Sequence, residues 1–311
     1  MPRRLMFLLT GLVLLACAVY LMGPQQASDK ADITNEASAV PRMMDASEDT
    51  FSIIVLPDTQ FYSRDHPEIF AAQTRWIRDN AQRLNIAFVT HTGDVVDAGA
   101  SRSQWDAVNA SMSLLDGVVP YGIAPGNHDR GTLIGEYFPR SRFIGEKWFG
   151  GGFRQENSYQ TFSAAGEEYI IVHLGFCPDN ETLAWANIVL ADDPDRNAII
   201  VTHGFLGPEG RRGVRFCPNT QYIWDSLIAP NENVFLVLCG HEHAEAMRSD
   251  KADGRIVHQL LADYQDEPMG GGGYLRIMEF TPAKRRVDVL TYSPHLDRYE
   301  TGPYGNFSLD I

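Results

Sequence analysis

The feature that most constrains this chain is a strand-like run that stops abruptly in polar residues. Residues 119–124 are apolar and extended in pattern, and a Pro-Gly turn ends them. Asn127, His128 and Asp129 follow at once. In open α/β folds, the loops at the carboxyl ends of buried strands carry the chemistry. A tight turn capped by a side chain would also explain this single loop, so its interpretation depends on the rest of the chain.

Four other apolar runs end in the same way, with side chains that bind metals or carry protons. Asp58 and Gln60 follow residues 51–56, Asp94 and Asp97 follow 86–90, His203 follows 198–202, and His241 and His243 follow 234–239. Five such strand ends in chain order are hard to explain as turn caps. We therefore expect these side chains to meet at one site.

The segments between these strands have the periodicity of helices. Helices are predicted over residues 67–83, around Trp105 and over 180–192, with Ser101 and Gln104 as a capping box before Trp105. Further strands are predicted at 159–162, 169–174, 256–262, 274–280 and 287–292. Alternating strands and helices followed by a strand-rich tail predict an α/β fold of two sheets packed face to face, with helices outside.

Two segments have no such periodicity. Residues 131–156 are rich in Gly, Arg and aromatic residues and predict a long insertion of the kind that shapes substrate pockets. Residues 270–273 are four glycines, which we expect to form a flexible entry to the next strand. They are not a phosphate loop, because no Gly-Lys-Ser/Thr ending and no helical pattern follow them.

The amino-terminal residues 1–22 predict an export segment. Arg3 and Arg4 precede an apolar run over residues 5–22, whose helical length of roughly 27 Å approaches the ~30 Å of a hydrocarbon core. The positive flank predicts that the rest of the chain is exported, to the periplasm or cell surface if the source is bacterial. We expect an uncleaved membrane anchor, and the alternative is a lipoprotein acylated at Cys17.

Residues 23–50 and 51–311 differ in composition. The first segment is polar and aperiodic and predicts a flexible linker, which leaves the second as one domain. The net charge of −14, from 26 basic and 40 acidic residues, argues against nucleic acid as a partner. It does not exclude a phosphate substrate, because bound metal ions can reverse the local field.

The side chains at the five strand ends form a mixed oxygen and imidazole ligand set without cysteine. Such a set suits Mn, Fe, Zn or Co. The groups are numerous enough for two ions that share one carboxylate. Two ions about 3.5–4 Å apart can hold a hydroxide and stabilise both ends of an in-line displacement at phosphorus.

As a set, these motifs resemble those of the calcineurin-like metallophosphoesterases. The residues that carry the resemblance are Asp58-Thr59-Gln60, Gly93-Asp94-Val95-Val96-Asp97, Gly126-Asn127-His128-Asp129, His203 and Gly240-His241-Glu242-His243. The resemblance implies a metallophosphatase fold, a four-layer αββα sandwich of two mixed β-sheets flanked by helices. It also implies phosphoester hydrolysis by a hydroxide that bridges two divalent ions.

The resemblance further assigns a role to each residue. The first ion would be held by Asp58, Gln60, Asp94 and His243, and the second by Asp94, Asn127, His203 and His241. His128 would donate a proton to the leaving oxygen or bind a phosphate oxygen, and Asp97 would hydrogen-bond His128 and hold it charged. Gln60 departs from the family, which has histidine there, and predicts a shift toward Mn-like ions with easier metal loss. Ala98 replaces an arginine of the family's protein phosphatases, which argues against a phosphoprotein substrate.

Several weaker signals leave alternatives open. Arg211, Arg212 and Arg215 either bind substrate phosphate or form a solvated charged loop. Tyr264 and Gln265 either line the pocket or pack at a strand end, and His91 is a candidate to support a metal ligand. The cysteines at 177 and 217 either pair, if the domain is exported, or remain free thiols.

Two functions from other classes were weighed against phosphoester hydrolysis. A catalytically silent binding or scaffold protein of the same fold should lack ligands, whereas only Gln60 deviates here, and it can still coordinate. A zinc protease built on His241-Glu242-His243 fails on spacing, because that motif needs two histidines four residues apart on a helix. Nothing in the sequence identifies the phosphoester.

Overall fold

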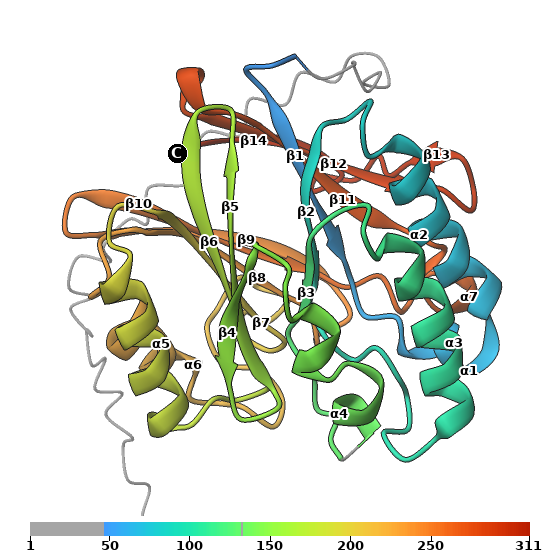
Figure 1. Ribbon diagram of the computed structural model, residues 1–311. Helices are drawn as coiled ribbons and strands as arrows, with labels where there is room; N and C mark the ends of the chain where they lie inside the picture. The colour runs from blue at the N-terminus through green and yellow to red at the C-terminus, as the bar shows by residue number, and fades with distance from the viewer. Residues whose placement is uncertain (1–46, 132) are drawn as a thin grey trace, which may run out of the picture. The chain divides into compact units, whose positions relative to one another are not determined.

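Two β-sheets packed face to face, each covered on its outer face by helices, form the described part of the chain in the computed structural model (Figure 1). The structure describes residues 47–131 and 133–311, all of which belong to one compact unit. The predicted four-layer αββα arrangement of two mixed sheets is confirmed.

The first sheet is built around the predicted opening strand. Its order is β13-β12-β11-β1-β2-β3, with β14 paired to β12, and only β1-β2 and β2-β3 are parallel. The strands are β1 (Phe51–Leu56), β2 (Ile86–His91), β3 (Tyr121–Ile123), β11 (Leu275–Thr281), β12 (Arg286–Ser293), β13 (Arg298–Tyr299) and β14 (Asn306–Asp310). The carboxyl ends of the three parallel strands therefore share one edge.

The second sheet has the order β4-β5-β6-β7-β8-β10-β9, with β6, β7, β8 and β10 parallel. Its strands are β4 (Phe149–Phe153), β5 (Asn157–Ala164), β6 (Glu167–Leu174), β7 (Asn197–Thr202), β8 (Val234–Cys239), β9 (Glu245–Ala252) and β10 (Arg255–Ala262). The loops that follow β7 and β8 carry the predicted histidines.

Alternation of side chains along β1 explains why both of its faces are apolar. Phe51, Ile53 and Val55 point into the core between the sheets, while Ile54 and Leu56 pack under helices of the outer layer. Strands buried on both faces have continuous apolar sequences instead of alternating ones.

Helices cover the two outer faces. The helices are α1 (Gln60–Asp65), α2 (Pro67–Asn80), α3 (Arg102–Met112), α4 (Leu133–Tyr137), α5 (Asn180–Asp192), α6 (Thr220–Ile223) and α7 (Pro268–Gly271). Residues of α2 and α3 pack on the first sheet, and residues of α5 and α6 on the second.

The predicted helix over 67–83 ends at Asn80 instead. The capping box is wrong, because the Ser101 side chain caps nothing and the Gln104 amide oxygen accepts from the backbone N–H of Ala98 at 2.8 Å.

The insertion at 131–156 contains α4 and β4, and the four-glycine segment overlaps α7.

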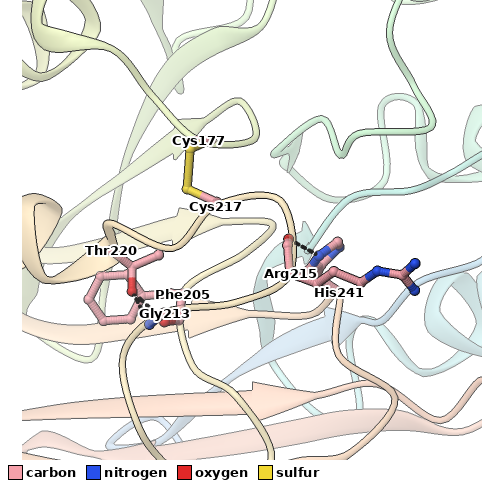
Figure 2. The surroundings of a disulfide bond; sticks show 7 residues. All are labelled: Cys177, Phe205, Gly213, Arg215, Cys217, Thr220 and His241. Carbon is pink, nitrogen blue, oxygen red and sulfur yellow. Dashed lines mark hydrogen bonds between the residues drawn. A yellow bond between two sulfur atoms is a disulfide. The ribbon is translucent and has the colours of Figure 1, made fainter.

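Cys177 and Cys217 form a disulfide (Figure 2), which resolves the alternative left open by the sequence. The disulfide joins the loop after β6 to the loop between β7 and α6.

The predicted anchor at residues 1–22 and most of the predicted linker lie outside the described residues. Residues 47–50 form a turn, and the side chain of Asn85 donates to the carbonyl oxygen of Thr50 at 2.7 Å. Within the described part, no helix combines the length and apolarity needed to cross a membrane.

Candidate metal centre

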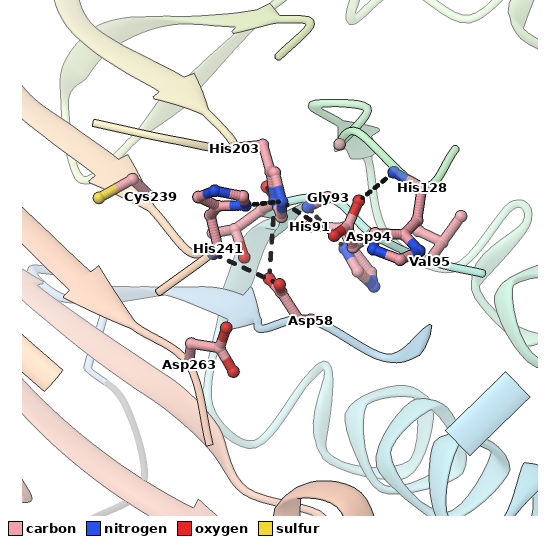
Figure 3. Close-up of polar contacts among 12 residues, drawn as sticks. Asp58, His91, Gly93, Asp94, Val95, His128, His203, Cys239, His241 and Asp263 are labelled. Carbon is pink, nitrogen blue, oxygen red and sulfur yellow. Dashed lines mark hydrogen bonds and ion pairs between the residues drawn. The ribbon is translucent and has the colours of Figure 1, made fainter. Parts of the chain in front are cut away.

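Three predicted ligands from different strand ends meet where the two sheets face each other (Figure 3). Oδ2 of Asp94, after β2, lies 3.0 Å from Nε2 of His203, after β7. Nε2 of His203 in turn lies 3.1 Å from Nδ1 of His241, after β8. One potential ligand atom from each of the three residues lies within 4.8 Å of the others. Three of the predicted ligand segments, which are far apart in the sequence, thus lie together in the structure.

The hydrogen bonds of the two histidines orient their lone pairs toward the same point. A carbonyl oxygen only accepts, so Nδ1 of His203 donates to Thr92 at 3.0 Å. For the same reason Nε2 of His241 donates to the carbonyl oxygen of Arg215 at 2.8 Å. In the neutral rings, Nε2 of His203 and Nδ1 of His241 therefore both carry lone pairs and face each other. A cation held by both nitrogens would replace this repulsion with coordination, as is usual for metal-binding histidines whose second nitrogen is hydrogen-bonded.

Three predicted oxygen ligands are buried without a hydrogen bond. Oδ1 of Asp58, Oε1 of Gln60 and Oδ1 of Asn127 have no hydrogen-bond partner among the described residues, although Oδ1 of Asp58 lies 3.8 Å from Nδ1 of His203. A buried polar atom without a partner costs about 1–3 kcal/mol, and native proteins contain few of them. Three such oxygens on the loops of one site fit an ion that they would coordinate.

The carboxylates of the site are strongly perturbed. Burial raises the pKa of Asp58 well above its usual value, and the nearby Asp263 and Asp94 raise it further. Burial also opposes ionisation of Asp94, but His203 and the backbone N–H of His128 lower the pKa of Asp94 below its usual value. Crowded carboxylates of this kind are stabilised by positive charge, which a bound cation supplies.

The backbone at the site is strained in the way that functional loops often are. Asp94 and His241 adopt the left-handed conformation, with φ of 48° and 76°. Gly126 and Gly240 allow close approach, because a Cβ at these positions would collide with the carboxylates of Asp94 and Asp58 respectively. The glycines of the two motifs are thus required by the packing of the ligands.

Asp129 holds two ligand loops together. Its carboxylate is buried and accepts from the N–H groups of Val95 at 2.8 Å, Val96 at 3.1 Å and Gly126 at 2.8 Å. Burial raises the pKa of Asp129 to about 7. Asp129 therefore joins the loop after β2, which carries Asp94, to the loop after β3, which carries Asn127.

His243 lies on the Asp58 side of the site. Its ring packs edge-on against Phe61, with 6.4 Å between ring centroids, and its Nδ1 lies 2.8 Å from Oδ1 of Asp266. Both Asp58 and His243 act electrostatically on Asp263, which places all three residues in one neighbourhood. That Asp58 and His243 share an ion stays a prediction.

The contact between His128 and Asp97 differs from the predicted one. Nδ1 of His128 donates to the main-chain carbonyl oxygen of Asp97 at 2.7 Å, while the Asp97 carboxylate lies 3.9 Å away. That carboxylate pairs with Arg64 at 3.1 Å instead. The backbone N–H of His128 donates to Asp94 at 2.8 Å, which fixes His128 at the edge of the site.

The predicted substrate arginines do not gather at the site. Arg212 is buried, pairs with Asp250, and its guanidinium carbon lies 3.7 Å from the ring centroid of Trp224. Arg211 is exposed beside Glu209. The carbonyl oxygen of Arg215 accepts from His241, and its guanidinium carbon lies 4.7 Å from the ring centroid of Phe216. Arg212 is therefore a structural residue, because its charge is already neutralised and its ring contact is buried.

Tyr264 and Gln265 lie at a strand end, and Tyr264 supports packing. The Tyr264 hydroxyl donates to Glu245 at 3.1 Å, inside the core. Of the two alternatives, packing at a strand end fits the position of Tyr264. The backbone N–H of Gln265 donates to Asp263 at 2.9 Å, and the side-chain nitrogen of Gln265 is buried without a hydrogen bond to any described residue.

His91 supports the site as expected, with Nε2 3.0 Å from the Thr59 hydroxyl and Nδ1 accepting from Gly93 at 3.1 Å.

Two residues of the site were missed by the sequence reading. Asp263 follows β10 and lies beside Asp58, with its Oδ2 unpaired among the described residues and its pKa raised by burial to about 6 (Figure 3). An acidic residue directly after the apolar run 256–262 was the available signal. Arg130 follows the Asn127-His128-Asp129 motif, and its guanidinium lies over the ring of Phe176, 5.7 Å from the centroid.

A cavity of about 190 Å³ adjoins the site on this side. Its lining includes Gly126, Asp129, Arg130, Phe176 and Cys177. Arg130 makes no ion pair with any residue that the structure describes, whereas Arg154, on the same cavity, pairs with Asp179 at 2.7 Å. The cavity thus presents one uncommitted positive charge next to the ligand loops.

Comparison with known proteins extends the description of this site. The model of the calcineurin-like phosphoesterase family matches residues 51–245. The chain is 40% identical over 286 residues to "Uncharacterized protein YvnB" of Bacillus subtilis (strain 168), a match that covers 85% of this chain and 22% of that protein. The chain thus spans less than a quarter of the length of that relative.

Two further similarities concern purple acid phosphatases. Over 46 residues, 15% of this chain and 8% of the relative, the chain is 44% identical to "Probable inactive purple acid phosphatase 27" of Arabidopsis thaliana. A purple acid phosphatase from yellow lupin (Lupinus luteus) seeds has a similar fold, with a TM-score of 0.53 and 14% identity. That similarity covers 84% of this chain and 54% of the lupin chain.

Proposed function

Because the chain belongs to the calcineurin-like phosphoesterase family, we propose that it hydrolyses phosphoesters with the help of divalent metal ions. The observation that carries this proposal is the convergence of Asp94, His203 and His241. The unpartnered buried oxygens of Asp58, Gln60 and Asn127 support it, since they complete a mixed oxygen and nitrogen ligand set.

The residues present suffice for two ions with Asp94 between them. Asp58, Gln60, Asp94 and His243 would hold the first ion, and Asp94, Asn127, His203 and His241 the second. When bound, such ions polarise the phosphoryl oxygens and lower the pKa of water so that it attacks at neutral pH. Manganese, iron, zinc and cobalt all suit the ligand set, and the amide oxygen of Gln60 favours Mn-like ions.

The chain itself supplies a proton at the leaving oxygen through His128. Nδ1 of His128 is committed to the carbonyl oxygen of Asp97, so Nε2 is the nitrogen that exchanges a proton with the substrate. Proton donation by a positioned histidine typically contributes a factor of about 10²–10⁴ in rate. Asp97 acts as a positioning residue through its backbone, in place of the carboxylate dyad that the sequence suggested.

The phosphorylated substrate would enter beside the ligand loops. Arg130 is placed to bind an anionic group of the substrate, because its guanidinium is held over Phe176 and pairs with no described carboxylate. A guanidinium binds phosphate or carboxylate through paired hydrogen bonds. The negative net charge of the chain makes nucleic acid an unexpected partner.

We also propose that the domain works outside the cytoplasm, tethered to the membrane by residues 1–22. The apolar run after Arg3 and Arg4 supports the tether, and the Cys177–Cys217 disulfide supports an oxidising compartment. Added protease should cleave the domain on intact cells that carry the full chain. Protection until the cells are lysed would contradict this location.

The activity is tested on the full chain loaded in turn with Mn, Fe, Zn and Co. Initial rates are measured with p-nitrophenyl phosphate and bis(p-nitrophenyl) phosphate, and bound metal is counted by elemental analysis. We expect hydrolysis that depends on metal and falls at least about 100-fold in Asp94→Asn, because the carboxylate between the ions is lost. Asp79→Asn, on the exposed side of α2, is the matched control and should retain the full rate.

Two results would count against the proposal in different ways. A chain that binds no metal would remove its basis. A chain that binds two equivalents of metal and hydrolyses neither ester nor a wider panel of monoesters and diesters would favour the silent binding protein instead.

A further inference from the structure

We propose that the Cys177–Cys217 disulfide is a positioning element of the metal centre, which holds the ring of His241 in its metal-binding orientation. The inference rests on the proposed metal site. The disulfide joins two loops that both contact His241. Figure 2 shows the disulfide and the contact of one of these loops, through Arg215, with His241.

The first segment is the loop after β6, which contains Phe176 and Cys177. The ring centroid of Phe176 lies 4.8 Å from that of His241 and 5.6 Å from that of His203. The backbone N–H of Phe176 donates to the carbonyl oxygen of Pro125 at 2.9 Å. The residue next to the disulfide therefore packs directly on two candidate ligands.

The second segment is the tip of the loop between β7 and α6. The carbonyl oxygen of Arg215, two residues before Cys217, accepts from Nε2 of His241 at 2.8 Å. The backbone N–H of Arg215 donates to the Glu242 carboxylate at 2.7 Å. The Arg215 carbonyl thus fixes the tautomer of His241 that leaves Nδ1 free to coordinate.

The base of this loop is anchored by further hydrogen bonds, whereas the tip is held by the disulfide and by the two hydrogen bonds of Arg215. The Thr220 hydroxyl accepts from the N–H of Gly213 and donates to the carbonyl oxygen of Phe205 at 2.9 Å (Figure 2). At the tip, Val214 and Cys217 form a small turn with two backbone hydrogen bonds of 3.1 Å. Opening the disulfide should therefore leave the tip held by the Arg215 hydrogen bonds alone and let it move, while the rest of the fold stays in place.

The backbone conformation next to the disulfide also indicates that the disulfide holds the loop tip in place. Cys177 and Phe216 both have positive φ, 55° and 64°, which is unfavourable for residues with a side chain. Phe216 is 69% exposed, so burial of its ring does not hold the turn. Conformations of this kind persist where other bonds enforce them, and the covalent link is the one that spans both loops.

Loss of the link should weaken metal binding before it weakens the fold. With the tip released, the Arg215 carbonyl no longer holds the proton on Nε2 of His241, and the Phe176 ring no longer limits rotation of the imidazole. Losing the partner that orients a metal-bound histidine typically lowers metal affinity about 10–100-fold. We expect at least a tenfold rise in the dissociation constant of the ion held by His203 and His241.

The experiment compares Cys177→Ser/Cys217→Ser with the oxidised wild-type chain. Co²⁺ and Mn²⁺ affinities are measured by competition with a chelator, and folding is followed by far-ultraviolet circular dichroism. The double variant removes both sulfurs, so neither position can supply a thiol as a new ligand. Arg211→Ala, an exposed change in the same loop, is the matched control and should bind metal as the wild type does.

Reduction of the folded wild type gives an independent measurement. A phosphine supplies two electrons, two protons come from water to form the two thiols, and the phosphine takes the oxygen. We expect the reduced chain to bind metal as weakly as the double variant, and the double variant to be unaffected by the phosphine. If the double variant does not fold, the reduced wild type decides the question, with thiol counting to confirm that the bond has opened.

The possible outcomes separate this inference from the proposed function. Equal affinities in the oxidised, reduced and variant chains, with metal bound in all, would overturn the positioning role and leave the phosphoesterase proposal standing. Absence of metal binding in the oxidised wild type would overturn the proposed site itself. Phe176→Leu, which keeps the disulfide and removes the ring on His241, should weaken binding less than loss of the disulfide does.

Discussion

Nε2 of His203 lies 3.1 Å from Nδ1 of His241, and the second nitrogen of each ring already donates to a carbonyl oxygen. When both rings are neutral, two imidazole lone pairs therefore face each other beside the Asp94 carboxylate in a buried site. A cation resolves this arrangement, and the residues around it are those that a metal-dependent hydrolase needs.

The Gln60→His variant tests the effect of the amide ligand. An amide oxygen binds borderline metals such as zinc more weakly than imidazole does. We expect the variant to bind Zn²⁺ about tenfold more tightly and to lose preference for Mn²⁺, as measured by chelator competition. Unchanged affinity and preference would show that Gln60 does not coordinate.

Removal of the His128 side chain tests the proton donor. His128→Gln should lower kcat by about 10²–10⁴ for esters with a poor leaving group, and by less for p-nitrophenyl phosphate, whose leaving group needs little protonation. The measurement is kcat against the pKa of the leaving alcohol. A uniform loss over all esters would indicate a role in binding instead.

The Asp97→Asn variant distinguishes the observed contact from the one that the sequence suggested. Because His128 bonds the main-chain oxygen of Asp97, the substitution leaves that hydrogen bond in place. We expect kcat to change by less than about threefold, with a small loss of stability from the half-exposed pair with Arg64. A loss as large as that of His128→Gln would show that the carboxylate acts directly.

Arg130→Ala tests the uncommitted guanidinium at the cavity. Loss of a charge-assisted hydrogen bond costs about 1.5–3 kcal/mol. KM should therefore rise roughly tenfold or more for esters whose alcohol part carries a negatively charged group. KM for esters whose alcohol part is uncharged should rise less. Arg212→Ala is the matched control, because it should lower stability and leave KM unchanged. Equal effects of Arg130→Ala on both classes of ester would contradict the role.

A buried histidine outside the site predicts how stability depends on pH. His173 accepts from Thr90 and donates to Gln160, both at 2.8 Å, and burial lowers its pKa to about 3. The unfolded chain binds the proton below about pH 6.5 and the folded chain does not, so stability falls as pH falls from about 6.5 toward 3.

The contribution of His173 approaches 1.4 kcal/mol per pH unit in that range. This contribution is measured by urea unfolding of the wild type and of His173→Gln at pH 7, 6, 5 and 4. The titration of the carboxylates affects the unfolding free energy of both proteins equally and cancels in the comparison. The variant should lose less stability on acidification than the wild type. Parallel curves would show that His173 is not kept neutral in the folded protein.

The fold and the meeting of Asp94, His203 and His241 were predictable because strand burial and loop chemistry are local properties. Continuous apolar runs such as Phe51–Leu56 fix a strand buried on both faces, and a polar residue directly after it must lie at the sheet edge. Glycine at 126 and 240 marks the places where the backbone approaches a carboxylate.

The errors arose where the outcome depends on tertiary contacts. The course of the loop between β7 and α6 turns Arg212 into the core, which no local pattern encodes. The choice between the carbonyl and the carboxylate of Asp97 depends on loop geometry. Asp263 was missed because it stands alone after β10, without a motif around it, although it follows a buried strand as the others do.

The most direct test of the central claim is an anomalous diffraction measurement on crystals of the domain grown with Mn²⁺. We predict a strong peak within coordination distance of Asp94, Nε2 of His203 and Nδ1 of His241, with a second peak near Asp58 and Gln60. Crystals that show no peak there, or metal only at other residues, would contradict the account.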